Sequence, residues 1–498
     1  MKNGTKLGLS YKMFIKEINR FSLLSFVGFT AITITSLMVA WQTDLYFLMA
    51  IPAVILVAML AILNTRNIFY LLLFAIPCSI EFSFSASLAT DIPTEPLIVG
   101  LMICFFVFMA YRPHYFDVQF FKHPIILLLG IQFCWMIFAS IYSIDPQMSL
   151  KYLLAKIWYL CAFIGMGSVF LREEKDIKSF FWYIYIPLTI LIVVSIIRFI
   201  PLGFAFDSVN KTMTPYFRNK VIYGTFMSIF LPFIFTATHW YEKGSFKRML
   251  LQVSKLFYII AIYFTYTRAC ILSLLACLLF YFVIKYRKVK QTLVMIFIFV
   301  AMIIGYLVHD NKFMDYSPSF LKTIYHDNYE DHLTSTVSFE DASSMERIFM
   351  WIGGAYYFLE SPIVGNGPNT FFPNYKHYTV NSFKTYLSEN DEHLTIHNYF
   401  LLTLIEQGLV GIFIFLLIIV VLLLYAEKYY HLAKPSFHKN LLMATTLSFV
   451  CILVNCTLSD LLETDKIGSI YFLNIAILVN IMVVLSKANT HGTNIIRK

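Results

Sequence analysis

The sequence predicts an all-α polytopic membrane protein with about 14 transmembrane helices and one large, partly helical periplasmic loop. Hydrophobic residues make up 59% of the chain and charged residues 13%, roughly half the charged share of an ordinary soluble domain. Apolar runs of roughly 17–25 residues recur from end to end, and each is long enough to cross a hydrocarbon layer of about 30 Å. The mean hydropathy of +0.71 agrees with this class.

Most of the predicted spans precede a long polar segment, and the last three follow it. The spans before the segment are roughly 21–41, 44–63, 67–80, 95–111, 124–143, 149–170, 178–200, 220–240, 250–267, 269–284 and 291–308, and those after it are roughly 397–425, 439–457 and 467–486. The stretch 250–284 admits one long helix or two short ones. Basic residues lie at both of its ends, which favours two spans joined by a far-side turn at Thr267-Arg268.

The basic residues also orient the chain. The excess that gives a net charge of +9 lies in short connections between apolar runs, so it requires no nucleic-acid partner. The same rule places both termini in the cytoplasm, with a basic N-terminus ahead of a retained signal-anchor helix. The segments 81–95, 201–219, the turn at Arg268 and 309–396 then lie on the far side.

Three parts follow from this pattern: an N-terminal transmembrane bundle (1–308), a large periplasmic loop (309–396) and C-terminal transmembrane helices (397–498). The loop is too long to be an idle connection. Apolar residues at three- and four-residue spacing predict a helix from Ser343 to Glu360. A cluster of proline and glycine after Pro362 predicts a turn. All eight cysteines fall inside apolar runs, so neither a disulfide framework nor a thiolate metal site is predicted.

The candidate site begins where the polar segment meets the next apolar run. His397 and Asn398 stand at that boundary, and Glu406 lies a little over two turns further in, where an unpaired carboxylate costs about 2.5–3.5 kcal/mol. Each residue has a structural alternative: His397 as a helix-start residue, Asn398 as a cap, and Gly408 with Gly411 as tight helix packing.

Basic residues near the membrane face complete the candidate set. Arg218, Arg268 and Arg347 all come out on the His397 side, and Lys156 enters the sixth span from that side. The alternatives are snorkelling, interface anchoring or a simple ion pair. Guanidinium groups fit phosphate oxygens and stay charged, so arginines beside a neutral histidine suit a diphosphate leaving group and a hydroxyl that loses a proton.

These residues resemble the signature of the bacterial O-antigen ligase and polymerase superfamily. The segments that carry the resemblance are His397-Asn398-Tyr399…Glu406…Gly408…Gly411, Arg347…Trp351 and Pro362…Gly365-Asn366-Gly367…Phe371, with Thr267-Arg268 matching more weakly. The resemblance implies a glycosyltransferase of the bacterial inner membrane, with its active site in the periplasm. Its donor is an undecaprenyl-diphosphate-linked glycan, and its acceptor is lipid A–core or another lipid-linked glycan, in contact with membrane lipids.

Carried over by position, His397 matches the family's proposed base. Arg268 matches an arginine that usually follows a serine, a place that Thr267 takes here, and Arg218 matches an earlier phosphate-contacting arginine. The catalytic set is therefore His397, Arg268 and Arg218. We assign substrate binding to Arg347, Asn398, Glu406 and Lys156. The implied reaction inverts the anomeric carbon and needs neither metal nor cofactor, and this sequence has no compact ligand set that would demand a metal.

Several functions remain open within and outside this family. We favour a ligase that joins O-antigen to lipid A–core, because the histidine and two arginines resemble that branch, although about two extra spans count against it. A repeat-unit polymerase and an oligosaccharyltransferase acting on protein hydroxyls need the same site. A lipid-linked-glycan flippase or transporter is the alternative of another class, but the halves show no internal repeat.

Overall fold

The computed structural model describes residues 27–36, 64–85, 88–310, 342–378, 396–434 and 437–496, together with residues 38, 39, 42, 52 and 312. Two compact units can be separated, residues 1–68 and 69–498. The described part of the first unit includes a short apolar helix, Val27–Ser36. The predicted span 44–63, much of 21–41 and a large part of the 309–396 loop lie outside the described residues.

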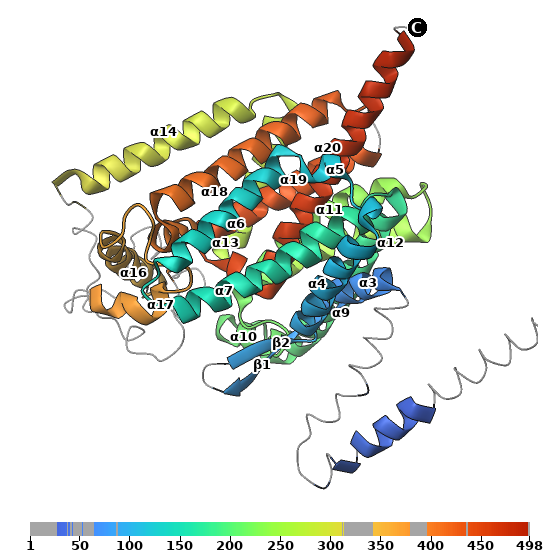
Figure 1. The fold of residues 1–498 in the computed structure, drawn as a ribbon, viewed down its shortest axis with the longest axis horizontal. Coiled ribbons are helices and arrows are strands. Elements are labelled where there is room, and N and C mark those ends of the chain that lie inside the picture. The colour runs from blue at the N-terminus through green and yellow to red at the C-terminus, as the bar shows by residue number, and fades with distance from the viewer. Residues whose placement is uncertain are drawn as a thin grey trace, which may run out of the picture. The chain divides into compact units, whose positions relative to one another are not determined.

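Helices dominate the second unit (Figure 1). The elements are α3 (Thr65–Cys78), β1 (Ile80–Ser85), β2 (Leu88–Ile92), α4 (Thr94–Tyr111), α5 (Val118–Phe121), α6 (Pro124–Ile141), α7 (Pro146–Tyr159), α8 (Gly167–Phe170), α9 (Glu174–Phe199), α10 (Val209–Met213), α11 (Lys220–Ala237), α12 (Phe246–Tyr263), α13 (Arg268–Lys285), α14 (Val289–Val308), α16 (Ala342–Phe358), α17 (Phe371–Asn374), α18 (Tyr399–Leu432), α19 (Phe437–Cys456) and α20 (Asp465–Ile496). A π-helical stretch, Leu160–Met166, joins α7 to α8.

The helices confirm a multi-pass membrane protein. Within the described ranges, 10 helices are long and apolar enough to cross a bilayer. The stretch 250–284 forms two helices, α12 and α13, as the flanking basic residues predict. The helix predicted from Ser343 to Glu360 is also present, as α16. The total of about 14 spans stays a prediction.

One element departs from the all-α expectation. Segment 81–95, which we expected only as a far-side connection, contains an antiparallel hairpin of β1 and β2 in which Ile80 pairs with Ile92. The sequence Ile-Glu-Phe-Ser-Phe-Ser alternates apolar and polar residues, which is the period of a strand. The hairpin is short and lies between two apolar runs, so hydropathy alone does not reveal it.

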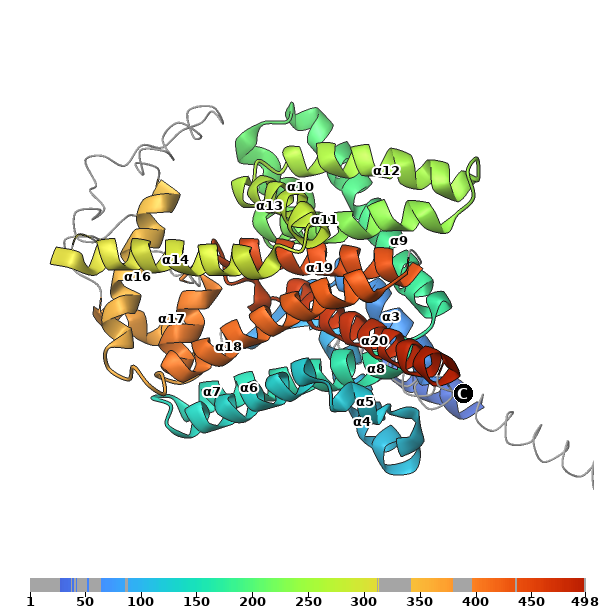
Figure 2. The same ribbon diagram turned by 90° about the horizontal axis from the view of Figure 1, so that it is seen from above.

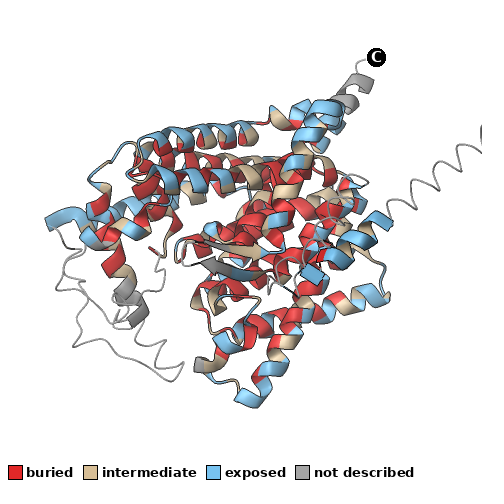
Figure 3. Ribbon diagram, turned by 60° about the horizontal axis from the view of Figure 1, so that its bottom comes forward, coloured by how far each residue is buried: buried red, intermediate tan, exposed pale blue. Residues whose placement is uncertain are grey.

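Burial separates central helices from peripheral ones. In the apolar window of α20, 94% of residues are buried, whereas none are buried in that of α14. Figure 3 shows the same contrast between the buried interior and the exposed outer helices. The helices α18, α19 and α20 lie side by side in Figures 1 and 2. A helix as apolar as α14 with so little protein cover is expected to face lipid hydrocarbon.

Hydrogen bonds fix the relative direction of the helices that carry candidate residues. Near its C-terminal end, α18 contacts the C-terminal end of α13, through His431 Nε2 and the carbonyl of Ile284 (2.8 Å). At the other end, Thr267 Oγ1, just before α13, donates to the carbonyl of Lys220 at the start of α11 (3.4 Å). Therefore α11, α13 and α18 all begin at one face of the bundle, which we call the His397 face.

A buried lysine closes the end of α3 at this face. Lys466, near the start of α20, is 5% exposed, and its ammonium donates to the carbonyls of Ile76 and Ser79, both at 3.0 Å. Asp465 accepts a hydrogen bond from the Ser79 hydroxyl (2.8 Å). Because the last carbonyls of a helix have no intrahelical donor, Lys466 supplies the charge and the hydrogen bonds that the end of α3 requires.

We predict that Lys466→Met lowers the free energy of unfolding by about 3–5 kcal/mol, because it leaves the buried Asp465 without its cationic neighbour. The matched control is Lys487→Met on the same helix, where the ion pair with Asp117 (2.6 Å) is at the surface. That change should cost less than about 1 kcal/mol. Reversible unfolding of the purified protein in detergent measures both, and equal losses would contradict the role of Lys466.

Candidate active site

His397 is held in an uncommon backbone conformation directly before α18. Its φ is +52°, in the left-handed region that residues with a Cβ seldom adopt. Asn398 follows as the helix N-cap, and its Oδ1 accepts from the N–H of Leu401 (3.0 Å). The capping alternative for Asn398 is thus present in the structure. Strained residues of this kind are concentrated at active sites and ligand-binding sites, which makes His397 a candidate functional residue.

The helix α16 packs against the segment that carries His397. The indole of Trp351 donates to the carbonyl of Ile396 (2.9 Å), next to His397 in the chain. A Cβ added at Gly354 would lie 2.8 Å from Ile396 Cδ1, so the helix and this segment approach closely here. Arg347 stands one turn before Trp351, on the same helix, and its charge acts on His397.

The electrostatics of this corner keep the histidine neutral. Burial, and to a smaller extent the positive charge of Arg347, together lower the pKa of His397 to about 4. An imidazole with such a pKa is uncharged at neutral pH and has a free lone pair on one ring nitrogen.

The first turns of α18 are separated from the rest of the helix by a break at Gly408. Its φ of +69° and ψ of −172° lie in a region open essentially to glycine alone. The break frees three carbonyls from the helical pattern, and each finds another donor. Ile405 O accepts from the N–H of Asn366 (3.0 Å), Glu406 O from the N–H of Gly367 (3.0 Å), and Gln407 O from the indole of Trp135 (2.9 Å).

The loop after α16, residues 362–368, forms hydrogen bonds with backbone groups that the break leaves without helical partners. The N–H groups beyond Gly408 also find partners there, since Leu409 donates to the carbonyl of Pro362 (2.9 Å). The loop and α18 approach so closely that a Cβ at Gly408 would lie 2.1 Å from Ile363 O, and one at Gly365 would lie 2.4 Å from the Glu406 backbone. We call this loop the 362–368 splint. The structural alternative for Gly408 was tight packing between helices. The structure shows instead that Gly408 is required at a break in α18.

Glu406 belongs to the same construction. Its side chain is buried, and Oε1 accepts from the N–H of Phe371, at the start of α17 (3.1 Å). The carboxylate thus holds the chain that follows the splint. The sequence placed Glu406 among the substrate-binding candidates; in the structure its carboxyl group accepts hydrogen bonds from backbone N–H groups.

Lys156 is likewise engaged with protein groups. Its ammonium pairs with Glu463 (3.1 Å) and lies 4.6 Å from the centre of the Tyr152 ring. Tyr152 donates to the other carboxylate oxygen of Glu463 (3.0 Å). Sequence reasoning missed Glu463, although a carboxylate in the short far-side connection between the last two spans was a usable signal.

Arg218 and Arg268 form a second group at the His397 face. Arg218 precedes α11 and lies 3.5 Å from Glu81 of β1, with 60% of its side chain exposed. Arg268 is the first residue of α13, which the Thr267–Lys220 hydrogen bond joins to α11. The structure thus gathers the candidates into two groups on one face: His397 with Arg347, and Arg218 with Arg268. Within the described residues, no set of three or more His, Cys, Asp or Glu side chains is placed to hold a metal ion.

Comparison with known proteins agrees with the residues that carry the resemblance. Residues 253–416 match a family model described as O-Antigen ligase. The match runs from α12 into α18 and includes Arg268, Arg347 and His397, whereas Arg218 and Lys156 lie outside it. No curated protein matches the chain. The family match confirms the resemblance to the O-antigen ligase and polymerase superfamily.

We predict that Gly408→Ala destabilises the protein, because the backbone conformation alone costs about 1–3 kcal/mol and the new methyl group would collide with the splint. The thermal unfolding midpoint in detergent should fall by several degrees. Gly130→Ala in α6 is the matched control, since a Cβ there meets nothing within 4 Å, and its midpoint should hold or rise. A Gly408→Ala protein as stable as the control would contradict the splint.

Proposed function

We propose that this member of the O-antigen ligase and polymerase superfamily transfers a glycan from an undecaprenyl-diphosphate carrier to an acceptor hydroxyl at the periplasmic face of the bacterial inner membrane. The form we favour is ligation of O-antigen to lipid A–core. The observation that supports it most directly is the position of His397, held in a left-handed backbone beside Arg347 on the face where Arg218 and Arg268 also lie.

The reaction we propose is a direct displacement. The acceptor oxygen bonds to the anomeric carbon while the bond from that carbon to the diphosphate breaks, and the diphosphate leaves with the electron pair. His397 accepts the proton of the acceptor hydroxyl, for which its lone pair must be free. Arg218 and Arg268 stabilise the charge that develops on the departing diphosphate. Attack from the side opposite the leaving group inverts the anomeric configuration.

Arg347 has a separate part in this scheme. In the absence of substrate its charge helps to keep His397 neutral, but a base with a pKa of about 4 accepts a proton weakly. A bound diphosphate brings negative charge to the same face and offsets the charge of Arg347, which raises the pKa of His397 toward a value suited to a base. His397 would thereby become an effective base only when the donor, with its diphosphate leaving group, is bound.

The remaining candidates contact protein groups that hold the first turns of α18 in place. Glu406 and Asn398 bind backbone groups on either side of the first turns of α18, and Lys156 holds Glu463 beside them. These three were expected to bind substrate, but their contacts are to protein groups, so we now propose them as positioning residues. Ligase and polymerase share the chemistry and differ in the acceptor. A deletion strain distinguishes them: full-length chains stranded on the carrier indicate a ligase, and surface lipid bearing one repeat indicates a polymerase.

The direct test uses purified protein with an undecaprenyl-diphosphate-linked glycan and lipid A–core. Wild-type protein should release undecaprenyl diphosphate, and His397→Ala should slow that release by about 100-fold or more, the usual worth of a general base. The matched control is His377→Ala, an exposed histidine that follows α17, which should keep full activity. Glycan movement across a vesicle without release of the diphosphate would indicate a transporter instead.

The pH dependence gives an independent check. A base works unprotonated, so activity should be lost as pH falls through the pKa of His397. In kcat/KM, which reports the free enzyme, the fall should come near pH 4. In kcat, which reports the substrate complex, it should come at a higher pH. Arg347→Gln should move the kcat/KM limb upward, toward the ordinary histidine value of about 6.5. A wild-type kcat/KM limb already near that value would contradict a half-buried histidine that is kept neutral in the free enzyme.

A further inference from the structure

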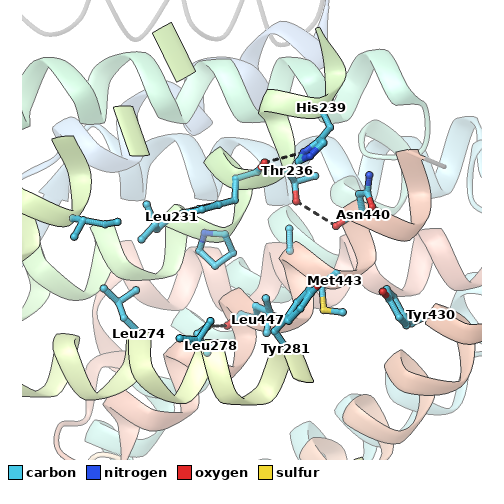
Figure 4. Close-up of a pocket in the computed structure, with 15 residues that line it drawn as sticks. Leu231, Thr236, His239, Leu274, Leu278, Tyr281, Tyr430, Asn440, Met443 and Leu447 are labelled. Carbon is cyan, nitrogen blue, oxygen red and sulfur yellow. Dashed lines mark hydrogen bonds between the residues drawn. The ribbon is translucent and has the colours of Figure 1, made fainter. Parts of the chain in front are cut away.

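A cavity lies in the half of the bundle away from the His397 face. It has a volume of about 680 Å³, within the range of ligand sites, about 300–1,000 Å³. The walls come mainly from the second halves of α11 and α13 and the first half of α19. Figure 4 shows Leu231 and Leu274 toward one end, and His239, Asn440 and Tyr430 toward the other.

The cavity is open on the side that membrane hydrocarbon would occupy. Leu278 is 58% exposed and Phe235 is 45% exposed, although both line it. Exposed leucine and phenylalanine beside an apolar hollow are suited to contact with acyl chains. The polar end is the end furthest from the His397 face, because α11 and α13 finish there and α19 begins there.

Three lysines surround this polar end, each beside an aromatic ring that lines the cavity. The Nζ of Lys255 lies 4.8 Å from the centre of the Phe235 ring, that of Lys285 lies 5.8 Å from Tyr281, and that of Lys439 lies 4.6 Å from Tyr430. Over the described ranges, none of the three takes part in an ion pair. Basic groups at the end of an apolar pocket that lies at the membrane–water interface are the arrangement that binds anionic lipid headgroups.

We propose that this cavity binds an anionic diacyl phospholipid from the leaflet opposite the His397 face. One acyl chain occupies the apolar part beside Leu278, and the phosphate lies among Lys255, Lys285 and Lys439. The undecaprenyl-diphosphate donor is a poorer occupant, because in the proposed reaction its phosphates lie at the His397 face. The three lysines lie at the opposite end of the bundle, so they require a lipid whose charged headgroup lies at that opposite membrane surface.

The test is native mass spectrometry of the purified full-length protein with palmitoyl-oleoyl phosphatidylglycerol or phosphatidylcholine. Wild-type protein should retain phosphatidylglycerol more tightly than phosphatidylcholine. The triple variant Lys255→Gln, Lys285→Gln, Lys439→Gln should weaken phosphatidylglycerol binding by about tenfold or more. The control triple, Lys243→Gln, Lys288→Gln, Lys290→Gln, removes the same charge from the α11–α12 connection and the start of α14 at that face, and it should have little effect. Equal retention of the two lipids, or equal losses in the two triples, would overturn the proposal.

A second pair of variants tests the apolar part. Leu278→Trp fills the cavity and should displace phosphatidylglycerol, whereas Leu279→Trp, at a neighbouring position with 59% exposure that does not line the cavity, should not. Both sites are at the protein surface, so neither change threatens the fold. Indistinguishable binding by the two variants would refute an acyl chain at Leu278. Tighter, lysine-dependent retention of undecaprenyl phosphate would refute the choice of a diacyl phospholipid.

Discussion

The hydrogen-bonded contact between the 362–368 splint and the break in α18 is the constraint on which the rest of the site depends. A helix interrupted at Gly408 leaves backbone carbonyls and N–H groups without intrahelical partners, and an unsatisfied backbone group costs several kcal/mol at membrane depth. The splint, a segment of the extramembrane loop, supplies most of those partners, and the indole of Trp135 in α6 supplies the one for Gln407. The loop and the transmembrane bundle are therefore joined through backbone hydrogen bonds, which are short and directional, rather than through side chains alone.

This joint explains how a histidine at the edge of the bundle can be positioned accurately. The splint follows α16 in the chain, and α16 also carries Trp351 and Arg347 to the segment before α18. His397 thus lies between two contacts made by one helix and its following loop. A side chain on a long connection would otherwise move with that connection, and a base displaced by about 1 Å loses much of its effect.

The sequence predicted some of this arrangement and could not predict the rest. Hydropathy and the positions of Lys and Arg predicted α12 and α13 as two helices, because span length and charge bias act locally. The sequence did not predict the hairpin of β1 and β2, because its alternating pattern is short and lies between two long apolar runs. Glu406 was recognised as costly, but its partner, the N–H of Phe371, is a backbone group that no residue pattern names. Gly408 was ambiguous for a similar reason, because a glycine in an apolar run signals close packing and a break equally well.

The two candidate sites differ in the cations they present, and this difference bears on what each site is able to recognise. The His397 face carries Arg218, Arg268 and Arg347, whereas lysines surround the cavity at the other end. Arginine presents a planar fork of donors that fits phosphate oxygens in a fixed geometry, as a reacting diphosphate requires. Lysine is a point charge on a flexible stem, which holds a headgroup without orienting it. A site that must align a leaving group and a site that merely retains lipid would be expected to differ in their cations in this way.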